Sequence, residues 1–206
     1  MQGFWEIFRN FPVKFVYKIF LIYWESANIL NMIGIILYRP EKPSNVGNII
    51  RTCMAFDIKL VIIGPLTFNF SSKELKRAGM DYITESDYKI YDSIEEFNKD
   101  FKDKNIYYVT RYSKNIYSKN DYSDITEDIY FMFGRESTGI PHEILKENYE
   151  KTIRIPMVPS ARSLNLSNCV AIIASEALKQ RNFYSLSTRE VIKGEDFLFT
   201  EETKND

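Results

Sequence analysis

The chain has 206 residues, 45% of them hydrophobic, and its 27 basic and 28 acidic side chains give a formal net charge of -1. These values fit one ordinary globular domain with appendages, and they exclude a strongly basic nucleic-acid binder, although not a local basic patch. Two cysteines are too few for a disulfide scaffold, and His142 is the only histidine. We therefore expect neither a metal site nor a Ser-His-Asp triad, and we interpret Cys53 and Cys169 as buried free thiols.

Residues 1–31 are crowded with aromatic side chains and carry no clear cap or turn signal. Their apolar run 15–24 is interrupted by Lys18 and falls well short of the ~20 residues that a membrane span needs. No small-residue cleavage site follows the run as it would in a signal peptide. We favour the hypothesis that the functional protein starts at Met32 and that 1–31 is a mis-assigned upstream extension. The alternative is a peripheral amphipathic helix that packs on the domain or on a membrane surface.

Residues 32–181 alternate between strand and helix patterns. β-Branched and aromatic runs bounded by turn residues predict strands at 32–38, 59–64, 106–110, 129–134 and 152–156. Apolar residues at helical spacing predict helices at 45–56, 71–78, 92–101, 140–148 and 168–181. This alternation predicts an α/β fold in which a mainly parallel sheet carries helices on both faces.

Several of the predicted helices carry start signals. Ser71 with Glu74, and Ser93 with Glu96, have the spacing of capping boxes. Ser167 precedes the last helix as a good N-cap residue. That helix is apolar nearly all round, which predicts burial on more than one side, such as a core that continues into a subunit interface.

Residues 182–206 form the second appendage. Six acidic side chains stand against three basic ones in this segment. The simplest interpretation is a solvated, poorly ordered acidic tail.

Three polar loops follow apolar runs in the middle region, at 40–51, 133–141 and 155–168. Each combines Gly, Pro, Asn or Ser with charges, and loops at the carboxyl ends of parallel strands build sites at one edge of a sheet. The chain has no Gly-x-Gly fingerprint and no Gly-x-x-x-x-Gly-Lys phosphate loop. A nucleotide-like ligand must therefore be held by some other arrangement.

The first loop offers Asn45, Asn48 and Arg51 around the start of a helix, where free N–H groups and the helix dipole bind anions. Arg51 lies six residues after Asn45, so the two side chains could face one another across the first turns. The alternative is that Asn45 merely caps the helix and that Arg51 is solvated. This loop alone favours neither interpretation.

The second loop carries two glycines, Gly134 at a strand end and Gly139 at a turn, with the charged pair Arg135 and Glu136 at its apex. The charges favour a site over a plain strand-to-helix turn. The third loop alternates apolar with hydrogen-bonding residues over 163–168, which suits leucines packed in the core and hydroxyl and amide groups facing a ligand. A basic rim for phosphates could include six cations, each of which alone is more simply an ordinary surface charge: Arg51, Lys76, Arg77, Arg135, Arg154 and Arg162.

Together these segments resemble a known family. The three loops are similar to the signature motifs of the SPOUT methyltransferases, and more narrowly to the small tRNA (cytidine/uridine-2'-O-)-methyltransferases that modify the wobble nucleotide. The match runs in order from Met32 to about Gln180. Its closest stretches are Tyr38–Arg51, Lys76–Tyr82, Arg154–Pro159 and Arg162–Asn168.

The resemblance implies a SPOUT fold with a C-terminal trefoil knot, S-adenosyl-L-methionine as the methyl donor, and a homodimer. It places four residues around the cofactor: Val109, Gly134, Ile155 and Ser163. It places four more in the catalytic part of the site: Arg51, Asn45, Glu136 and Asn165. Arg51 matches the residue proposed in related enzymes to activate the ribose 2'-hydroxyl. Because the pKa of arginine is normally above about 12, Arg51 acts either as the base or as a phosphate ligand that stabilises developing alkoxide charge.

The chain departs from the family pattern at a few positions. The second motif usually reads Gly-Pro-Glu-Thr-Arg-Gly, whereas Thr138 replaces its arginine here and a new arginine appears at Arg135. The third motif often has Asp-Ser before the arginine, whereas Arg162 follows a serine and an alanine here. Ser175 stands where close relatives often have a tyrosine. These changes bear on the RNA contacts more than on the cofactor.

The leading hypothesis is therefore a cytoplasmic enzyme that methylates the ribose 2'-hydroxyl of the wobble nucleotide, position 34, of tRNA. The near alternative is a SPOUT 2'-O-methyltransferase acting on another tRNA or rRNA ribose. The alternative of another class is a catalytically inactive RNA-binding module. We expect tRNA and a second copy of the chain as partners, with no membrane and no metal.

Overall fold

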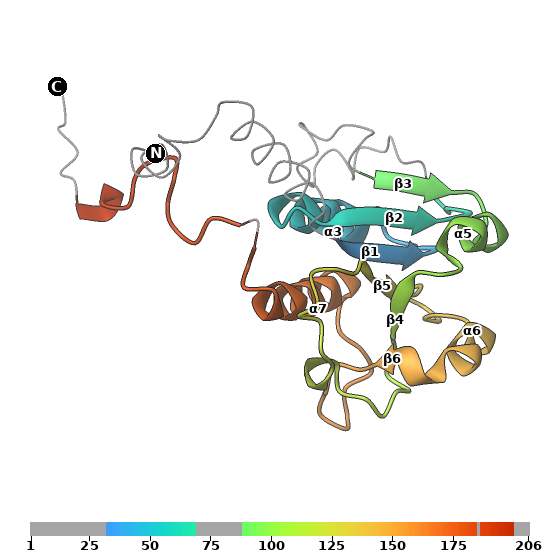
Figure 1. Ribbon diagram of the computed structural model, residues 1–206. Coiled ribbons are helices and arrows are strands. Elements are labelled where there is room, and N and C mark those ends of the chain that lie inside the picture. The colour runs from blue at the N-terminus through green and yellow to red at the C-terminus, as the bar shows by residue number, and fades with distance from the viewer. Residues whose placement is uncertain (1–31, 69–87, 185, 200–206) are drawn as a thin grey trace, which may run out of the picture.

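The three-dimensional structure, a computed structural model, describes residues 32–68, 88–184 and 186–199 (Figure 1). The N-terminal segment 1–31 and the predicted helix 71–78 lie outside the described residues. Six parallel strands form one sheet in the order β3-β2-β1-β5-β4-β6. Their bounds are β1 Ile33–Tyr38, β2 Lys59–Ile63, β3 Tyr88–Tyr91, β4 Asn105–Val109, β5 Ile129–Phe133 and β6 Thr152–Ile153.

The sequence predicted five of these strands, and the parallel sheet is confirmed. It missed β3, a short edge strand in which Lys89 and Ile90 are exposed, so no apolar alternation marks it. The strand predicted over 152–156 is wrong in its second half. After Ile153 the chain stays extended, but Arg154 pairs with the loop residue Ile116 and donates its backbone N–H to Asn115 O at 2.8 Å instead of continuing along β4.

Among the residues that the structure describes, four α-helices cover the sheet, with bounds α3 Pro43–Ala55, α5 Ile94–Phe101, α6 His142–Glu147 and α7 Leu166–Gln180. Strand β1 alternates between two cores because successive side chains point to opposite faces. Ile33, Ile35 and Leu37 pack with α3 and α7, whereas Ile36 and Tyr38 pack with α5 and α6. The predicted covering of both faces is therefore confirmed, and each predicted helix within the described residues is present.

Two predicted caps have different outcomes. The Ser93 cap is confirmed, since its hydroxyl accepts a hydrogen bond from Glu96 N at 3.2 Å. The Ser167 cap is wrong, because α7 starts earlier, at the buried Leu166. Asn165 is the cap residue, and its Oδ1 accepts hydrogen bonds from Ser167 N at 2.9 Å and Ser167 Oγ at 2.7 Å.

The C-terminal end of α7 is tied to the connection between β4 and β5. Arg181 is only 3% exposed, and its guanidinium donates to the carbonyl oxygens of Tyr122, Asp124 and Glu127 at 2.6–2.9 Å. Buried guanidinium groups need such acceptors because desolvation penalises an unpaired charge. This cluster fixes the 120–128 segment across the end of α7.

The two cysteines are free thiols. Cys53 is buried in the core, and burial raises the pKa of its thiol to about 12, whereas Cys169 on α7 is half-buried. Beyond α7, Tyr184 and Leu186 still pack against the core, and the following residues up to Phe199 are exposed. Among the helices that the structure describes, none combines the length and apolar character needed to cross a lipid bilayer.

Candidate functional site

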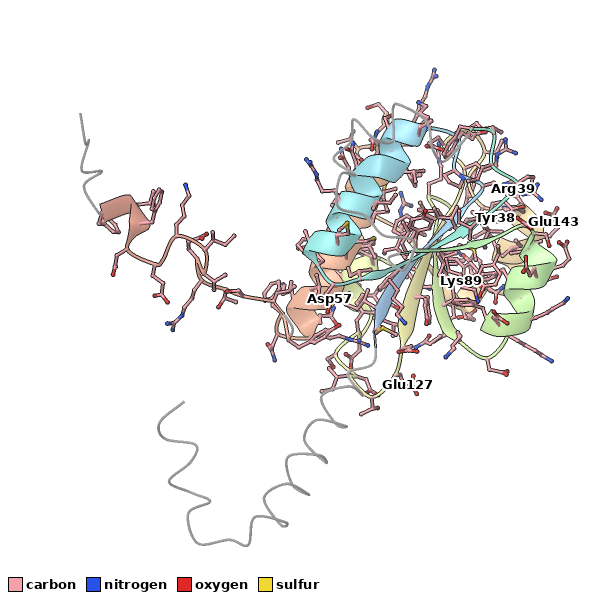
Figure 2. All side chains as sticks on the ribbon, turned by 90° about the horizontal axis from the view of Figure 1, so that it is seen from above. Tyr38, Arg39, Asp57, Lys89, Glu127 and Glu143 are labelled. Atoms are coloured by element: carbon pink, nitrogen blue, oxygen red, sulfur yellow. The ribbon has the colours of Figure 1, made fainter. Side chains whose placement is uncertain are left out.

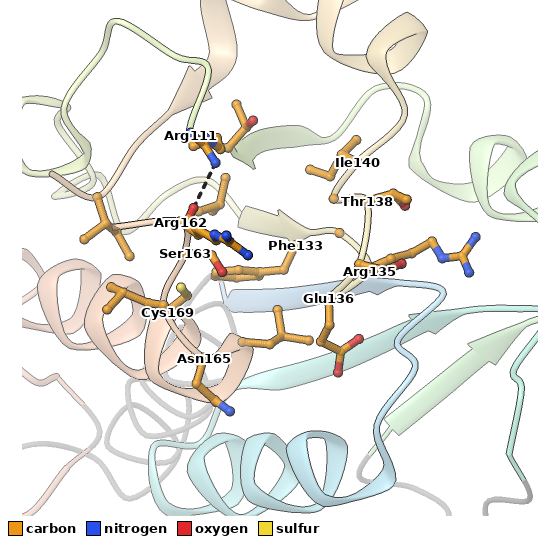
Figure 3. A pocket seen from close by; sticks show the side chains of 18 of the residues that line it. Arg111, Phe133, Arg135, Glu136, Thr138, Ile140, Arg162, Ser163, Asn165 and Cys169 are labelled. Atoms are coloured by element: carbon orange, nitrogen blue, oxygen red, sulfur yellow. Dashed lines mark hydrogen bonds between the residues drawn. The ribbon is translucent and has the colours of Figure 1, made fainter. Parts of the chain in front are cut away.

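A cavity of about 540 Å³ opens where the carboxyl ends of β4 and β5 meet the start of α7 (Figure 3). All three polar loops contribute to it, as expected for loops that follow parallel strands. Apolar walls come from Val109, Phe133, Ile155 and Leu164. The polar part of the lining includes Asn45, Arg111, Glu136, Thr138, Arg162, Ser163 and Asn165.

The loop after β5 turns back on itself within five residues. Arg135 N donates to Gly139 O at 3.1 Å and Gly139 N donates to Arg135 O at 2.9 Å. This closure leaves no room for a side chain at Gly134, where a Cβ atom would lie 2.0 Å from the carbonyl carbon of Gly139. Gly139 has a φ of +74°, which favours glycine. Both glycines singled out in the sequence are therefore needed to shape the cavity wall.

Glu136, at the apex of this loop, anchors the start of α3. Its carboxylate accepts hydrogen bonds from Glu41 N at 2.8 Å, Lys42 N at 3.2 Å and Asn45 Nδ2 at 2.8 Å. The helix has Lys42 as its cap residue, and the Lys42 side chain makes no capping bond. A carboxylate distant in sequence thus satisfies N–H groups at this helix start and complements its dipole.

Asn45 links this anchor to the third loop. It is 4% exposed, and its Oδ1 accepts a hydrogen bond from Asn165 Nδ2 at 2.9 Å. Because Asn165 also caps α7, a continuous chain of hydrogen bonds runs from Glu136 through Asn45 and Asn165 to Ser167. The interpretation that Asn45 merely caps its helix is wrong, since it lies inside α3 and bonds across to the other two loops.

Glu41 makes the reciprocal connection, from the first loop to the second. Its carboxylate accepts hydrogen bonds from Arg135 Nη2 at 2.6 Å, Ser137 Oγ at 2.8 Å and Ser137 N at 2.9 Å. The bond from the Ser137 hydroxyl, followed by the bonds from Arg135 and the Ser137 amide, holds the pKa of Glu41 below its usual 4.5. Each of the two loops therefore supplies a carboxylate, Glu41 or Glu136, that accepts hydrogen bonds from the backbone of the other loop.

Seven of the eight predicted site residues line the cavity: Asn45, Val109, Gly134, Glu136, Ile155, Ser163 and Asn165. The eighth, Arg51, is exposed on α3 and does not line it. Six helical residues correspond to a rotation of roughly 240°, so Asn45 and Arg51 lie on different sides of α3. Within the described residues, Arg51 is placed apart from the other seven.

Sequence reasoning did not assign Glu41 or Arg111 to the site. Glu41 could have been found from its position, because it follows β1 while Arg135 follows the neighbouring β5, which brings opposite charges to one edge. Arg111 carries no such signal. Its Nη1 donates to the backbone carbonyl of Arg162 at 3.0 Å, a bond drawn in Figure 3 that ties the β4 loop to the third loop.

The predicted basic rim is realised only in part. Arg135 and Arg162 line the cavity, whereas Arg51 and Arg154 do not. Lys76 and Arg77 lie outside the described residues. Of the two leucines expected to pack inward, Leu166 is buried and Leu164 is 39% exposed at the cavity wall.

The cavity has the size and chemistry of a small-molecule site. Its volume lies within the few hundred to about 1,000 Å³ typical of ligand pockets, and its apolar walls with a few convergent polar groups suit a nucleoside-sized ligand. Across the parts of the chain that the structure describes, no group of three His, Cys, Asp or Glu side chains is arranged to hold a metal ion. The parallel sheet and the site at its carboxyl edge define a ligand-binding α/β protein.

Comparison with known proteins makes this class specific. The chain belongs to the SpoU rRNA Methylase family, whose model matches residues 32–175. The resemblance drawn from the three loops is thereby confirmed. A relative from Listeria monocytogenes, named as a candidate tRNA (cytidine(34)-2'-O)-methyltransferase, is 48% identical over 152 residues, which are 74% of this chain and 90% of the relative.

Solved structures agree with the family. One, described as giving structural insights into the 2-OH methylation of C/U34 on tRNA, is 35% identical with a TM-score of 0.67 and covers 74% of this chain and 97% of its own. An AdoMet-bound rRNA methyltransferase from Sinorhizobium meliloti is 26% identical with a TM-score of 0.65 and covers 76% of this chain and 57% of its own.

Proposed function

We propose that this chain is a tRNA 2'-O-methyltransferase that transfers a methyl group from S-adenosyl-L-methionine to the ribose of nucleotide 34, a cytidine or a modified uridine. The observation that carries the proposal is the hydrogen-bonded chain Glu136–Asn45–Asn165, which joins all three motif loops at one cavity. The named relative and the C/U34 structure support tRNA as the substrate. We propose the cytoplasm as the location of this activity, which a tRNA substrate supports.

The cofactor assignment is supported by the shape of the cavity and by the AdoMet-bound family structure. The residues that would hold the cofactor are Val109, Gly134, Ile155 and Ser163. When bound, the cofactor supplies a methyl group already activated by its sulfonium. The apolar side chains of Val109 and Ile155 exclude water from this part of the cavity, and Gly134 allows close backbone approach.

The remaining site residues position the acceptor. A ribose hydroxyl is a poor nucleophile, so methyl transfer to it needs a fixed geometry and a group that accepts the hydroxyl proton. Glu136, Asn45 and Asn165 fix the polar end of the cavity by bonding one another. The Arg51 side chain makes no hydrogen bond or ion pair within the described residues, so its guanidinium is available to RNA, as base or as phosphate ligand.

We further propose a homodimer and a C-terminal trefoil knot. β6 lies at the edge of the sheet, yet α7, which follows it, packs on the central strands β1 and β5. On this path the chain passes the 110–128 connection, which bonds both to the segment after β6 and to the end of α7. This arrangement is the one that threading through a loop requires.

The test is the transfer of labelled methyl from S-adenosyl-L-methionine to bulk tRNA by a chain starting at Met32, followed by nucleoside mapping. Label in a 2'-O-methylated nucleotide 34 is the expected result. Label at another tRNA or rRNA ribose would contradict the proposed position. Cofactor binding without transfer to any RNA would indicate that the chain lacks the proposed activity, and failure to bind the cofactor would favour an inactive RNA-binding module.

Arg51 is tested separately. The Arg51→Ala variant should lose methyl transfer while its cofactor affinity and its oligomeric state, measured by light scattering, stay those of the unchanged chain. Turnover at the original rate would refute the role assigned to Arg51. The matched control is Lys59→Ala, which removes another exposed cation, at the start of β2, and should leave turnover unchanged.

A further inference from the structure

A second cavity of about 420 Å³ adjoins the first. The two share Arg135, Thr138, Gly139 and Ile140, so the loop after β5 forms their common wall. In Figure 3 the side chains of Arg135 and Thr138 point away from Ser163 and Arg162, toward the outer side of this loop. Figure 2 shows Tyr38, Arg39 and Glu143, which also line the second cavity, gathered at the same edge of the sheet.

Arg39 presents a cation that is held in place; the exposed carboxylate of Glu95 is close enough to interact with its charge, although no ion pair joins the two among the described residues. The residue has a left-handed backbone, with a φ of +46°, and its backbone N–H donates to Ile63 O at 2.8 Å. Its side-chain Nε donates to Gly64 O at 3.1 Å, and its guanidinium lies 5.4 Å from the centre of the Tyr38 ring. Within the described residues, no side chain accepts a hydrogen bond from either Nη atom of Arg39.

Three further donors converge on the same cavity without a hydrogen-bond acceptor in the described part of the chain. Arg135 donates hydrogen bonds from Nε and Nη2 to Glu41, and its Nη1 has no acceptor among the described residues. The His142 ring touches Tyr112 edge-on, at 5.4 Å between centroids, and makes no hydrogen bond. The Thr138 hydroxyl is exposed and likewise unbonded. Among the described residues that line this cavity, Glu143 is the one acid beside two arginines, Arg39 and Arg135, and Arg135 is already paired with Glu41 at 2.6 Å.

A cluster of unbonded donors around a cation calls for an anion, and guanidinium groups match phosphate geometry. We propose that this second cavity binds a phosphate of the RNA substrate next to the nucleotide being methylated. The inference rests on the proposed function, because the shared wall places the bound phosphate one cavity away from the reacting ribose. Phosphate contacts of this kind set the register of a nucleic acid on a protein without reading its sequence.

The cavity is open, and its arginines are partly exposed, so a free anion would bind weakly there. A phosphate covalently joined to a nucleotide held in the neighbouring cavity has a far higher effective concentration. The same groups are therefore suited to a tethered phosphodiester rather than to inorganic phosphate. Arg39 and Arg135 would then act as positioning residues for the acceptor strand.

The experiment measures binding of synthetic RNA anticodon stem-loops, in which the phosphate on one or the other side of nucleotide 34 is replaced by an uncharged methylphosphonate. Arg39→Gln should weaken binding of the native stem-loop about tenfold, since it removes a charged hydrogen bond. It should also reduce the slope of log affinity against log salt by about 0.7. S-adenosyl-L-methionine affinity should not change, and the loss of the bond to Gly64 O should lower the melting temperature only slightly. His142→Ala is a second variant that leaves the Arg39 backbone untouched, and it should weaken binding in the same direction.

The diagnostic result is a double-mutant cycle. One of the two methylphosphonates should weaken binding to the unchanged chain about tenfold. The same methylphosphonate should leave the affinity of the Arg39→Gln variant almost unchanged. The control Lys102→Gln, which removes an exposed cation at the end of α5, should leave both affinities as they were.

Independent, additive losses, or no loss with either methylphosphonate, would overturn the proposal. So would inorganic phosphate competing with the stem-loop at micromolar concentration, which would indicate a free-anion site instead. If the unchanged chain methylates tRNA, such results remove this inference alone. If it neither methylates tRNA nor binds the stem-loop, the proposed function falls and takes this inference with it.

Discussion

At the scale of single residues, the site depends on carboxylates that act on backbone groups of another loop. Glu136 accepts three N–H bonds from the first loop, and Glu41 accepts four donor contacts from the second. Hydrogen bonds to a charged acceptor contribute more than neutral ones, and a carboxylate has lone pairs enough for several. This exchange explains why a polar cavity wall made of loops keeps one geometry.

The Glu136→Gln variant tests the first carboxylate. An amide offers one acceptor oxygen, and its NH2 group would face N–H donors, so at least one bond to Glu41 N, Lys42 N or Asn45 is lost. We expect kcat/KM for methyl transfer to fall at least about tenfold. The matched control is Glu150→Gln, an exposed carboxylate outside both cavities, which should keep full activity. Equal activity of the two variants would contradict the anchoring role.

The second carboxylate predicts a pH dependence. Because the folded-state pKa of Glu41 lies below its usual 4.5, the ionised group stabilises the folded chain above about pH 4.5, and this contribution is lost as the pH falls through the folded pKa. The Glu41→Gln variant should therefore melt at a lower temperature than the unchanged chain at pH 7, and the gap should shrink toward pH 3. A gap that stays constant across this range would mean that the ionised carboxylate is not the source of the difference.

Sequence reasoning recovered most of the residues of the site but not their partners. Asn45, Glu136 and Asn165 were predictable because they stand in three polar segments that follow apolar runs and match family motifs. That Asn45 bonds Glu136 and Asn165 depends on the order of β1 and β5 in the sheet and on where α7 starts. Neither is encoded in local spacing, so the expectation that Asn45 and Arg51 could face each other had no structural basis.

At the scale of elements, the turn after β5 positions the site, since it forms the wall between the two cavities. Its geometry follows from the paired backbone bonds between Arg135 and Gly139. Two glycine substitutions separate the contributions of space and of backbone conformation in this turn.

Gly134→Ala should cost about 3 kcal/mol of unfolding free energy and raise the dissociation constant of S-adenosyl-L-methionine more than tenfold, because its methyl group would meet backbone atoms of Gly139 and Ile140 that cannot rotate away. Gly139→Ala meets no atom within 4 Å and should cost only about 1 kcal/mol for its left-handed φ. Denaturant unfolding and titration calorimetry measure both quantities. The reverse ranking of the two variants would show that backbone conformation, not space, limits this turn.

The boundaries of helices and strands could be predicted only where the residues that fix them are close in sequence. Ser93 was recognised because its partner Glu96 is three residues away. The start of α3 was placed two residues late, since the group that caps it, Glu136, lies 91 residues from Asn45. Similarly, β3 exists because it pairs with β2, and not because its own sequence has a buried face.

At the scale of the whole molecule, the chain returns from the edge strand β6 to the centre of the sheet before α7. The fold is therefore closed by contacts between α7 and the connection that follows β4. Gln180 bonds both sides of this connection, since its Oε1 accepts from Tyr122 N at 2.7 Å and its Nε2 donates to Asn120 O at 3.1 Å. Arg181 adds three carbonyl contacts beside it.

This closure predicts that Arg181 holds the molecule together rather than acting in catalysis. Arg181→Met keeps a similar apolar stem but leaves the carbonyls of Tyr122, Asp124 and Glu127 without their donor, which should cost about 3 kcal/mol of unfolding free energy. Lys179→Met, two residues earlier, removes only an exposed cation whose ion pair with Glu176 is 3.8 Å long, and should cost less than about 0.5 kcal/mol.

Equilibrium denaturation in urea measures both variants, and methyl transfer by the fraction that stays folded separates stability from activity. Arg181→Met should retain the kcat of the unchanged chain per folded molecule. Arg181 follows the C-terminal end of α7, whereas the residues of α7 that line the cavity lie at the start of the helix. A normal unfolding free energy would mean that α7 and the 120–128 connection are held by other contacts. A normal stability with lost turnover would instead place the connection itself in the reaction, since it continues into the Val109–Tyr112 wall of the cavity.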